Sequence, residues 1–358
     1  MHHKQLYFMA IIPLVCITFM GCATVGPETI ERDRPGYNDA IAESMKAQML
    51  LNMVKLRYGD MPLFLDVSSV INSYALEGTL DLSTSFTFGG PEVDQSIGAE
   101  GFYADKPTIT YSPLVGEKFT KSLLIPIPPE SIFFLVQAGV PVDFVFMTCV
   151  DAVNSVSNRK VRGARIEPAD PRFYDLMRAF RTIQDSGAMD IQIGGEEGKE
   201  KVLLFISQNV TPEVERSIET VLRILELSED RREFSLVYAR LPKSDEEIAI
   251  LSRSMYNILR DYSANVQVPE AHVTEKRAAI GAEVLEIPHD LSEFYINVYS
   301  SEKKPEDDFV AVSYHGYWFW IEDTDILSKN IFSFILLLFT LAGSDQKVLA
   351  PVITVPAS

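Results

Sequence analysis

The chain has 358 residues, and 47% of them are apolar, which is enough for a sizeable core in one large domain or two ordinary ones. Its 50 acidic residues outnumber its 32 lysines and arginines, giving a formal net charge of −18 at pH 7. A protein this acidic repels nucleic acid on average, so nucleic-acid binding is not expected.

The N-terminal segment has the pattern of an export signal. Lys4 precedes a charge-free, mostly apolar run from Leu6 to Met20. This run is shorter than the roughly 20 residues that a membrane-spanning helix needs, which favours a cleaved signal over a permanent anchor. The end of the run, Phe19-Met20-Gly21-Cys22, resembles the lipobox of bacterial lipoproteins.

This resemblance implies a signal peptide at residues 1–21, cleavage before Cys22, and lipid such as palmitate on that cysteine. The protein would then be attached to a membrane through this lipid. Ala23 follows the cysteine in place of the Asp that retains lipoproteins in the inner membrane, which implies a periplasm-facing protein of the outer membrane. Phe19 departs from the usual leucine. A non-lipidated signal or an uncleaved anchor is the alternative.

The next two segments are predicted to be a tether and a helix. Residues 22–36 contain two glycines and two prolines among charges, which predicts a lipidated tether. From Tyr37 to Tyr58 the apolar residues recur at helical spacing, which predicts an amphipathic helix. Its apolar side either packs on the domain core, which we favour, or lies on the bilayer near the anchor.

A long β-hairpin is predicted next. Residues 76–88 alternate between apolar and polar side chains, as in a strand with one wet face. Gly89-Gly90-Pro91 supplies a turn, and Ile97–Tyr103 forms a return strand. The apolar face needs a cover. Helices of the same chain, which we favour, or lipid can provide it, since a membrane strand has about 9 to 11 residues.

The rest of the chain favours an α+β fold with mixed sheets and packed helices. We divide the chain after the tether into an N-terminal lobe, residues 37–188, which includes the helix and the hairpin described above, and a C-terminal lobe, residues 189–358. Helical spacing predicts helices at 117–124, 129–138, 142–154, 171–186, 212–227, 245–262 and 323–343. Strands are predicted at 190–193, 202–207, 234–240, 294–299, 309–321 and 352–355. The apolar run from Ile331 to Ala342 is too short to cross a bilayer and is predicted to be a buried core helix.

No motif in the chain indicates catalysis. Motifs for nucleotides, phosphate, zinc peptidases and nucleophilic serine are missing, and the histidines lack ligand spacing, so no cofactor and no metal are expected. With Cys16 removed and Cys22 acylated, Cys149 is the one thiol left. It lies in an apolar run, which predicts a buried, unpaired core thiol rather than an intermolecular cross-link.

Two polar clusters are candidate binding sites. Aromatic and acidic residues gather at Trp318, Trp320, Glu322, Asp323 and Asp325. Such a patch can bind sugars or calcium. The alternative, which we favour, is structural: one strand face carries Tyr314, Trp318 and Trp320, and the acids lie where a helix begins, whose N-terminus favours negative charge.

The second cluster is basic, which is unusual in so acidic a chain. It is formed by Arg159, Lys160, Arg162 and Arg165. Such an island can dock phosphate groups or an acidic partner. A solvated loop is the alternative that we favour.

Three further segments carry a family resemblance. Tyr37–Ile41 (YNDAI), Leu50–Tyr58 (LLNMVKLRY) and Pro107–Leu114 (PTITYSPL) resemble motifs of a family of uncharacterised proteobacterial lipoproteins. Gly316–Ile321 (GYWFWI) is similar to its C-terminal pattern. The resemblance implies a cell-envelope location and carries over no activity or catalytic residue.

Three functions are compatible with the sequence. We favour a non-enzymatic scaffold or binding subunit of an envelope assembly, with an envelope protein partner or self-association. The second is a ring-forming lipoprotein whose hairpins join a composite outer-membrane pore. The third is a periplasmic enzyme or small-ligand binder that uses the aromatic-acidic patch.

Overall fold

The computed structural model describes residues 25–71, 74–86, 93–105, 108–162, 165–194, 201–278, 281 and 294–342. The predicted signal peptide, Cys22 and the strand at 352–355 lie outside these residues. The chain divides into two compact units. Unit 1 comprises Met1–Met45 with Leu65–Pro113, and unit 2 comprises Lys46–Phe64 with Leu114–Ser358. The described part is an α+β protein with several sheets.

Helix α2, Val25–Arg57, begins well before Tyr37 and includes residues predicted as a tether. Pro27 falls in its first turn, where a missing backbone N–H leaves no helical hydrogen bond unmade. The second proline of the predicted tether, Pro35, lies inside the helix, where it removes one backbone hydrogen bond without ending the helix. In the part of α2 that belongs to unit 2, the apolar side chains Met49, Leu50, Met53 and Val54 are buried. This part of the helix therefore packs on the domain core, which is the alternative that we favoured from the sequence.

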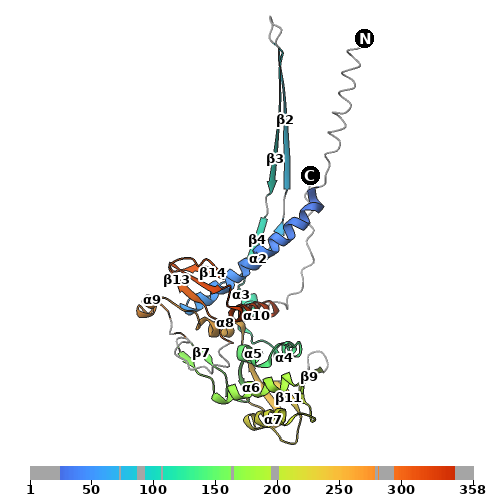
Figure 1. Cartoon of the computed structure of the whole chain (residues 1–358), viewed down its shortest axis with the longest axis vertical. Helices are drawn as coiled ribbons and strands as arrows, with labels where there is room; N and C mark the ends of the chain where they lie inside the picture. Colours follow the sequence, from blue (N-terminus) through green and yellow to red (C-terminus); the bar gives the residue numbers. More distant parts are fainter. Residues whose placement is uncertain are drawn as a thin grey trace. The chain divides into compact units, whose positions relative to one another are not determined.

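Unit 1 contains two antiparallel ladders. Strand β1, Leu65–Ile71, pairs with β4, Thr108–Pro113. Strand β2, Tyr74–Phe86, pairs with β3, Val93–Asp105, in an unbroken register (Figure 1). This confirms the predicted hairpin. The burial of its side chains, which would decide between helical cover and lipid, lies outside what the structure describes.

Unit 2 is built on a six-stranded mixed sheet with the order β6-β5-β12-β11-β10-β9. All neighbours are antiparallel except β11 and β12, which are parallel. Because β5 pairs with β12, the predicted boundary between residues 188 and 189 lies inside one unit. The strands are β5 Val150–Val153, β6 Val156–Ser157, β9 Met189–Gly194, β10 Lys201–Ile206, β11 Glu233–Tyr238 and β12 Glu247–Ser252.

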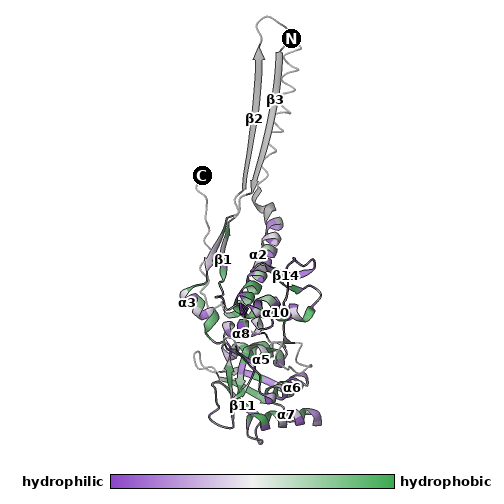
Figure 2. Ribbon diagram, turned by 90° about the vertical axis from the view of Figure 1, so that its left-hand side faces the viewer, coloured by the Kyte–Doolittle hydropathy of each residue, from purple (hydrophilic) through white to green (hydrophobic). Residues whose placement is uncertain are grey.

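Four helices pack with this sheet in one hydrophobic core. They are α4 Pro129–Gln137, α5 Val142–Cys149, α6 Pro171–Asp185 and α7 Pro212–Leu225. Figure 2 shows hydrophilic and hydrophobic residues mixed along α6 and α7, as expected for amphipathic helices. Asp170 caps the N-terminus of α6, and Thr211 caps that of α7.

The helix predicted at 245–262 is wrong in its first half. Residues 247–252 form β12, and helix α8, Met255–Ser263, starts only after Ser254 has capped it. Strand β12 is central and parallel to one neighbour, and Ile248, Ala249 and Ile250 are all buried. A strand buried on both faces shows a continuous apolar run, which periodicity cannot distinguish from a short buried helix.

A second, three-stranded sheet has the order β13-β15-β14. The single strand predicted at 309–321 is two strands, β14 Asp308–Tyr314 and β15 Tyr317–Glu322. His315 and Gly316 between them have positive φ angles of 48° and 85°, which a tight hairpin turn requires. The strand predicted at 294–299 shares only Tyr299 with the observed strand β13, Tyr299–Ser301.

Shorter elements complete the fold. A hairpin of β7 Lys160–Arg162 and β8 Arg165–Glu167 lies in the segment predicted as a loop. Segment 116–124 is a short helix, α3 Gly116–Phe119, followed by the π-helix η1 Thr120–Leu124. Helix α9 spans Glu270–Thr274.

Helix α10, Ile326–Ala342, contains the apolar run near the C-terminus. One side is in the core through Ile331, Phe332, Ile335 and Leu338, whereas Leu337 and Leu341 are exposed. The run is therefore a core helix on one side only. No helix in the described ranges is long and apolar enough to cross a membrane.

Cys149 is buried, as predicted, and is a free thiol among the described residues. Burial raises the pKa of its thiol to about 12, so the reactive thiolate is scarce at neutral pH. We expect a thiol reagent such as Ellman's reagent to label the native protein slowly and the urea-unfolded protein quickly. Equal rates in the two states would contradict the burial.

Candidate functional site

The aromatic residues of the predicted patch do not share one face. In β14–β15, Tyr314 lies opposite Tyr317, and Trp318 and Trp320 take the alternate positions of β15. The interpretation that placed Tyr314 with the two tryptophans is wrong, because the turn between the strands reverses the chain. Trp318 and Trp320 are half-buried, with Lys304 over the Trp318 ring at 5.5 Å and Tyr299 beside Trp320 at 5.8 Å.

Two acids of this patch, Asp323 and Asp325, contact the first turn of α10, whereas Glu322 is the last residue of β15. The Oδ1 of Asp325 accepts a hydrogen bond from the Ser328 backbone N–H at 3.0 Å, so Asp325 is the capping residue. Burial raises the pKa of Asp325, but hydrogen bonds from Ser328 and Asn297 outweigh it and hold the pKa below its usual value. Asp323 pairs with Lys329 at 2.7 Å. Among the described residues no cluster suited to a metal ion is found.

Only part of the predicted basic cluster lies at the surface. Arg159 is 1% exposed, so at this residue both the docking hypothesis and the solvated loop that we favoured are wrong. Arg162 and Arg165 are exposed on the β7–β8 hairpin, and Arg162 lies 3.9 Å from Glu167. Lys160 is half-buried at the start of the same hairpin. What remains at the surface is a small, partly neutralised cluster.

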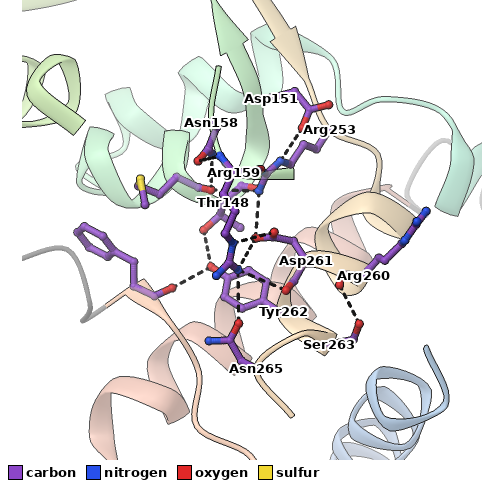
Figure 3. Close-up of polar contacts among 12 residues, drawn as sticks. Thr148, Asp151, Asn158, Arg159, Arg253, Arg260, Asp261, Tyr262, Ser263 and Asn265 are labelled. Atoms are coloured by element: carbon purple, nitrogen blue, oxygen red, sulfur yellow. Dashed lines mark hydrogen bonds and ion pairs between the residues drawn. The ribbon is translucent and has the colours of Figure 1, made fainter. Parts of the chain in front are cut away.

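Arg159 belongs to a buried ionic network instead (Figure 3). Its Nε and Nη2 donate to the two carboxylate oxygens of Asp261 at 3.0 and 2.8 Å. Arg253 approaches the same carboxylate at 3.4 Å and donates to Asp151 at 2.9 Å. Both guanidinium groups are only 1% exposed, and Asp261 is 5% exposed. Two positive and two negative side chains therefore balance inside unit 2.

The network ties distant segments together. Arg253 also donates to the carbonyls of Met147, Thr148 and Arg159. Tyr262 shares a hydrogen bond with Thr148 at 2.9 Å, and burial raises the pKa of its hydroxyl. Arg253 donates to protein acceptors through all three guanidinium nitrogens, and Arg159 does so through Nε and Nη2, whereas the buried Nη1 of Arg159 has no hydrogen-bond partner among the described residues. We infer that the network stabilises the junction of α5, β12 and α8.

A second polar cluster surrounds Tyr58 at the end of α2. Its hydroxyl is 2.7 Å from Nδ1 of the buried His272, and burial raises the pKa of Tyr58 to about 12. Tyr314 donates a hydrogen bond to the carboxylate of Asp60, and His315 packs against Tyr58 at 5.3 Å. Tyr58 and His272 are 214 residues apart, so no local pattern in the sequence could have indicated this contact.

One small apolar cavity lies in the core of unit 2. Its lining includes Phe133, Phe146, Phe180 and Ile248 and contains no polar side chain. A ligand site needs a few convergent polar groups to fix orientation. We therefore interpret this cavity as a packing void.

The β2–β3 ribbon is the other candidate, because its two faces differ in chemistry. Residues directly opposite in an antiparallel register share a face. One face has Leu76, Leu80, Leu82 and Phe86 on β2, opposite Tyr103, Ala99, Ile97 and Val93 on β3. The other face has Glu77, Thr79, Asp81, Ser83 and Ser85 on β2, opposite Phe102, Glu100, Gly98, Ser96 and Asp94 on β3.

The ribbon also has two open edges. Among the described strands, β2 and β3 pair only with each other. Each strand therefore has an outer edge that no described strand pairs with, and such an edge is a template for pairing with another strand.

Comparison with known proteins finds no matching family model, no similar curated protein and no similar solved structure. The resemblance to uncharacterised proteobacterial lipoproteins stays a prediction.

Proposed function

We propose that this protein is a non-enzymatic, lipid-anchored subunit of an assembly at the periplasmic side of the outer membrane, and that the β2–β3 ribbon joins it to this assembly. The observation that carries the proposal is the pairing of two 13-residue strands in a ladder that no other described strand extends. The N-terminal motif ending in Cys22 supports the lipid anchor.

Physical chemistry makes such a ribbon dependent on a partner. An isolated two-stranded hairpin is at best marginally stable in water, and three or more strands or a packed helix are normally needed. Proteins usually blunt long edge strands with prolines, bulges or lysines. Strands β2 and β3 contain none of these features: their register is unbroken, and residues 74–105 include no lysine. This supports a functional joining surface.

The test removes the ribbon and leaves the rest of the chain unchanged. Ala75 and Ala104 are opposite each other in the register, so an Asn-Gly turn can join them directly. We expect the lipidated variant, extracted from membranes in detergent, to have the mass of a single chain. The wild type should have the mass of a larger complex. The urea midpoint of unit 2 should be the same in both.

A matched control addresses the other surface candidate. Replacing Arg162 and Arg165 by Ser removes exposed charge from the β7–β8 hairpin and should leave the mass of the complex unchanged. A complex that survives loss of the ribbon, or dissociates in the control, would contradict the proposed role of the ribbon.

A further inference from the structure

We propose that ribbons from several copies of this chain join edge to edge in the outer membrane and close into a ring that forms a cation-selective pore. The apolar face contacts lipid, and the acidic face lines the water-filled lumen. This inference rests on the proposed function, because it identifies the partner of the ribbon as further copies of the same chain.

The length of the strands fits a membrane. Each strand has 13 residues. At ~3.4 Å per residue such a strand is about 44 Å long, and a tilt of about 45° reduces its span to about 31 Å. This covers the apolar band of outer-membrane strands, which is ~25 Å tall.

The order of residues along the apolar face also fits. Tyr74 and Tyr103 are close to one end of this face, and Phe86 is at the other end. Between them the face carries Leu80, Leu82 and small residues. Membrane strands have the same arrangement, in which aromatic residues at both interfaces flank an aliphatic middle. Helices of a protein core would not require aromatic residues at the two ends.

Four of the five acidic residues in β2 and β3 lie on one face of the ribbon. From Leu76 to Phe86 and from Val93 to Tyr103, each acidic residue lies on the face opposite the leucines: Glu77, Asp81, Asp94 and Glu100. Residues 74–105 include no lysine or arginine. Three residues are exceptions: Asp105, opposite Tyr74 at the end of the ribbon, and Gln95 lie on the apolar face, and Phe102 lies on the acidic face. Repeated in every copy, the four acids would form carboxylate rings, which favour cations.

The open edges explain why the partner is another copy. When β3 of one chain pairs antiparallel with β2 of the next, each copy repeats the same contact. Repeated head-to-tail contacts close into a ring when the rotations between successive copies add up to a full turn. In a closed ring every edge strand is paired. A bilayer requires this, because it offers no water to unpaired backbone N–H and C=O groups.

The experiment uses the full-length lipidated protein, purified in detergent and weighed by native mass spectrometry. It is then reconstituted into planar bilayers with a tenfold KCl gradient. We expect an oligomer whose conductance favours K⁺ over Cl⁻ several-fold. Neutralising the lumen with Glu77→Gln, Asp81→Asn, Asp94→Asn and Glu100→Gln together should bring the permeability ratio close to one.

A control variant makes the same changes on exposed acids of unit 2: Glu219→Gln, Glu229→Gln, Asp230→Asn and Asp245→Asn. It should keep the wild-type selectivity. A second pair of variants tests which face meets lipid. Leu82→Lys should abolish conductance, because a lysine would face hydrocarbon, whereas Ser83→Lys, one residue along, should conduct with reduced preference for K⁺.

The outcomes separate the two proposals. An oligomer that conducts nothing, or whose K⁺ preference survives neutralisation of the four acids, overturns the cation-selective pore and leaves the proposed assembly intact. A complex with a different protein and no self-association overturns the ring of copies. A single chain without any partner overturns both proposals.

Discussion

Replacing Asp261 with Asn is expected to lower the free energy of unfolding by about 3 to 5 kcal/mol. The carboxylate accepts two hydrogen bonds from Arg159 and is 3.4 Å from Arg253, and all three groups are buried. Asparagine keeps the shape of the side chain but removes its charge. Arg253 would then keep Asp151 as its partner, and the buried guanidinium of Arg159 would lack a counter-ion.

Urea unfolding followed by circular dichroism measures this effect. Asp185→Asn is the matched control, because it makes the same change at an ion pair with Arg181 whose side chains are 60% and 39% exposed. An exposed pair of this kind contributes only about 0 to 1 kcal/mol. If the two variants lose similar stability, the network is not the structural junction that we infer.

Replacing Cys22 with Ser is expected to release the protein from membranes or to leave it as an uncleaved precursor. The predicted lipid is the anchor, and each buried CH₂ of an acyl chain contributes about 0.8 kcal/mol to membrane affinity. Serine has no thiol to acylate. Fractionation of cell membranes, with the mass of the processed chain, measures both outcomes.

Cys16→Ser is the matched control. It also exchanges a cysteine for serine, but in the segment that the signal peptidase is predicted to discard, so the protein should be processed and retained normally. Normal processing and full membrane retention of the Cys22→Ser variant would contradict lipid anchoring.

Local patterns in the sequence determined several elements. The alternation from Leu76 predicted β2, and the helical spacing from Pro212 predicted α7, because one covered face imposes a period of two or of 3.6 residues. The mixed α+β class followed from the order of such elements. Where both faces are covered the period is lost, and β12 was therefore assigned to a helix.

Only the tertiary structure decided what the charged residues do. Arg159 and Arg162 are close in one basic run, yet Arg159 is buried against Asp261 and Arg162 is at the surface. The Tyr58 hydroxyl and His272 Nδ1 are in contact although the two residues are 214 positions apart in the sequence. Burial and pairing of a charge depend on segments that are distant in sequence, and local composition does not contain this information. The sequence by itself determined the alternating period of the ribbon, and the register of β2 with β3 then placed four of its five acids on one face.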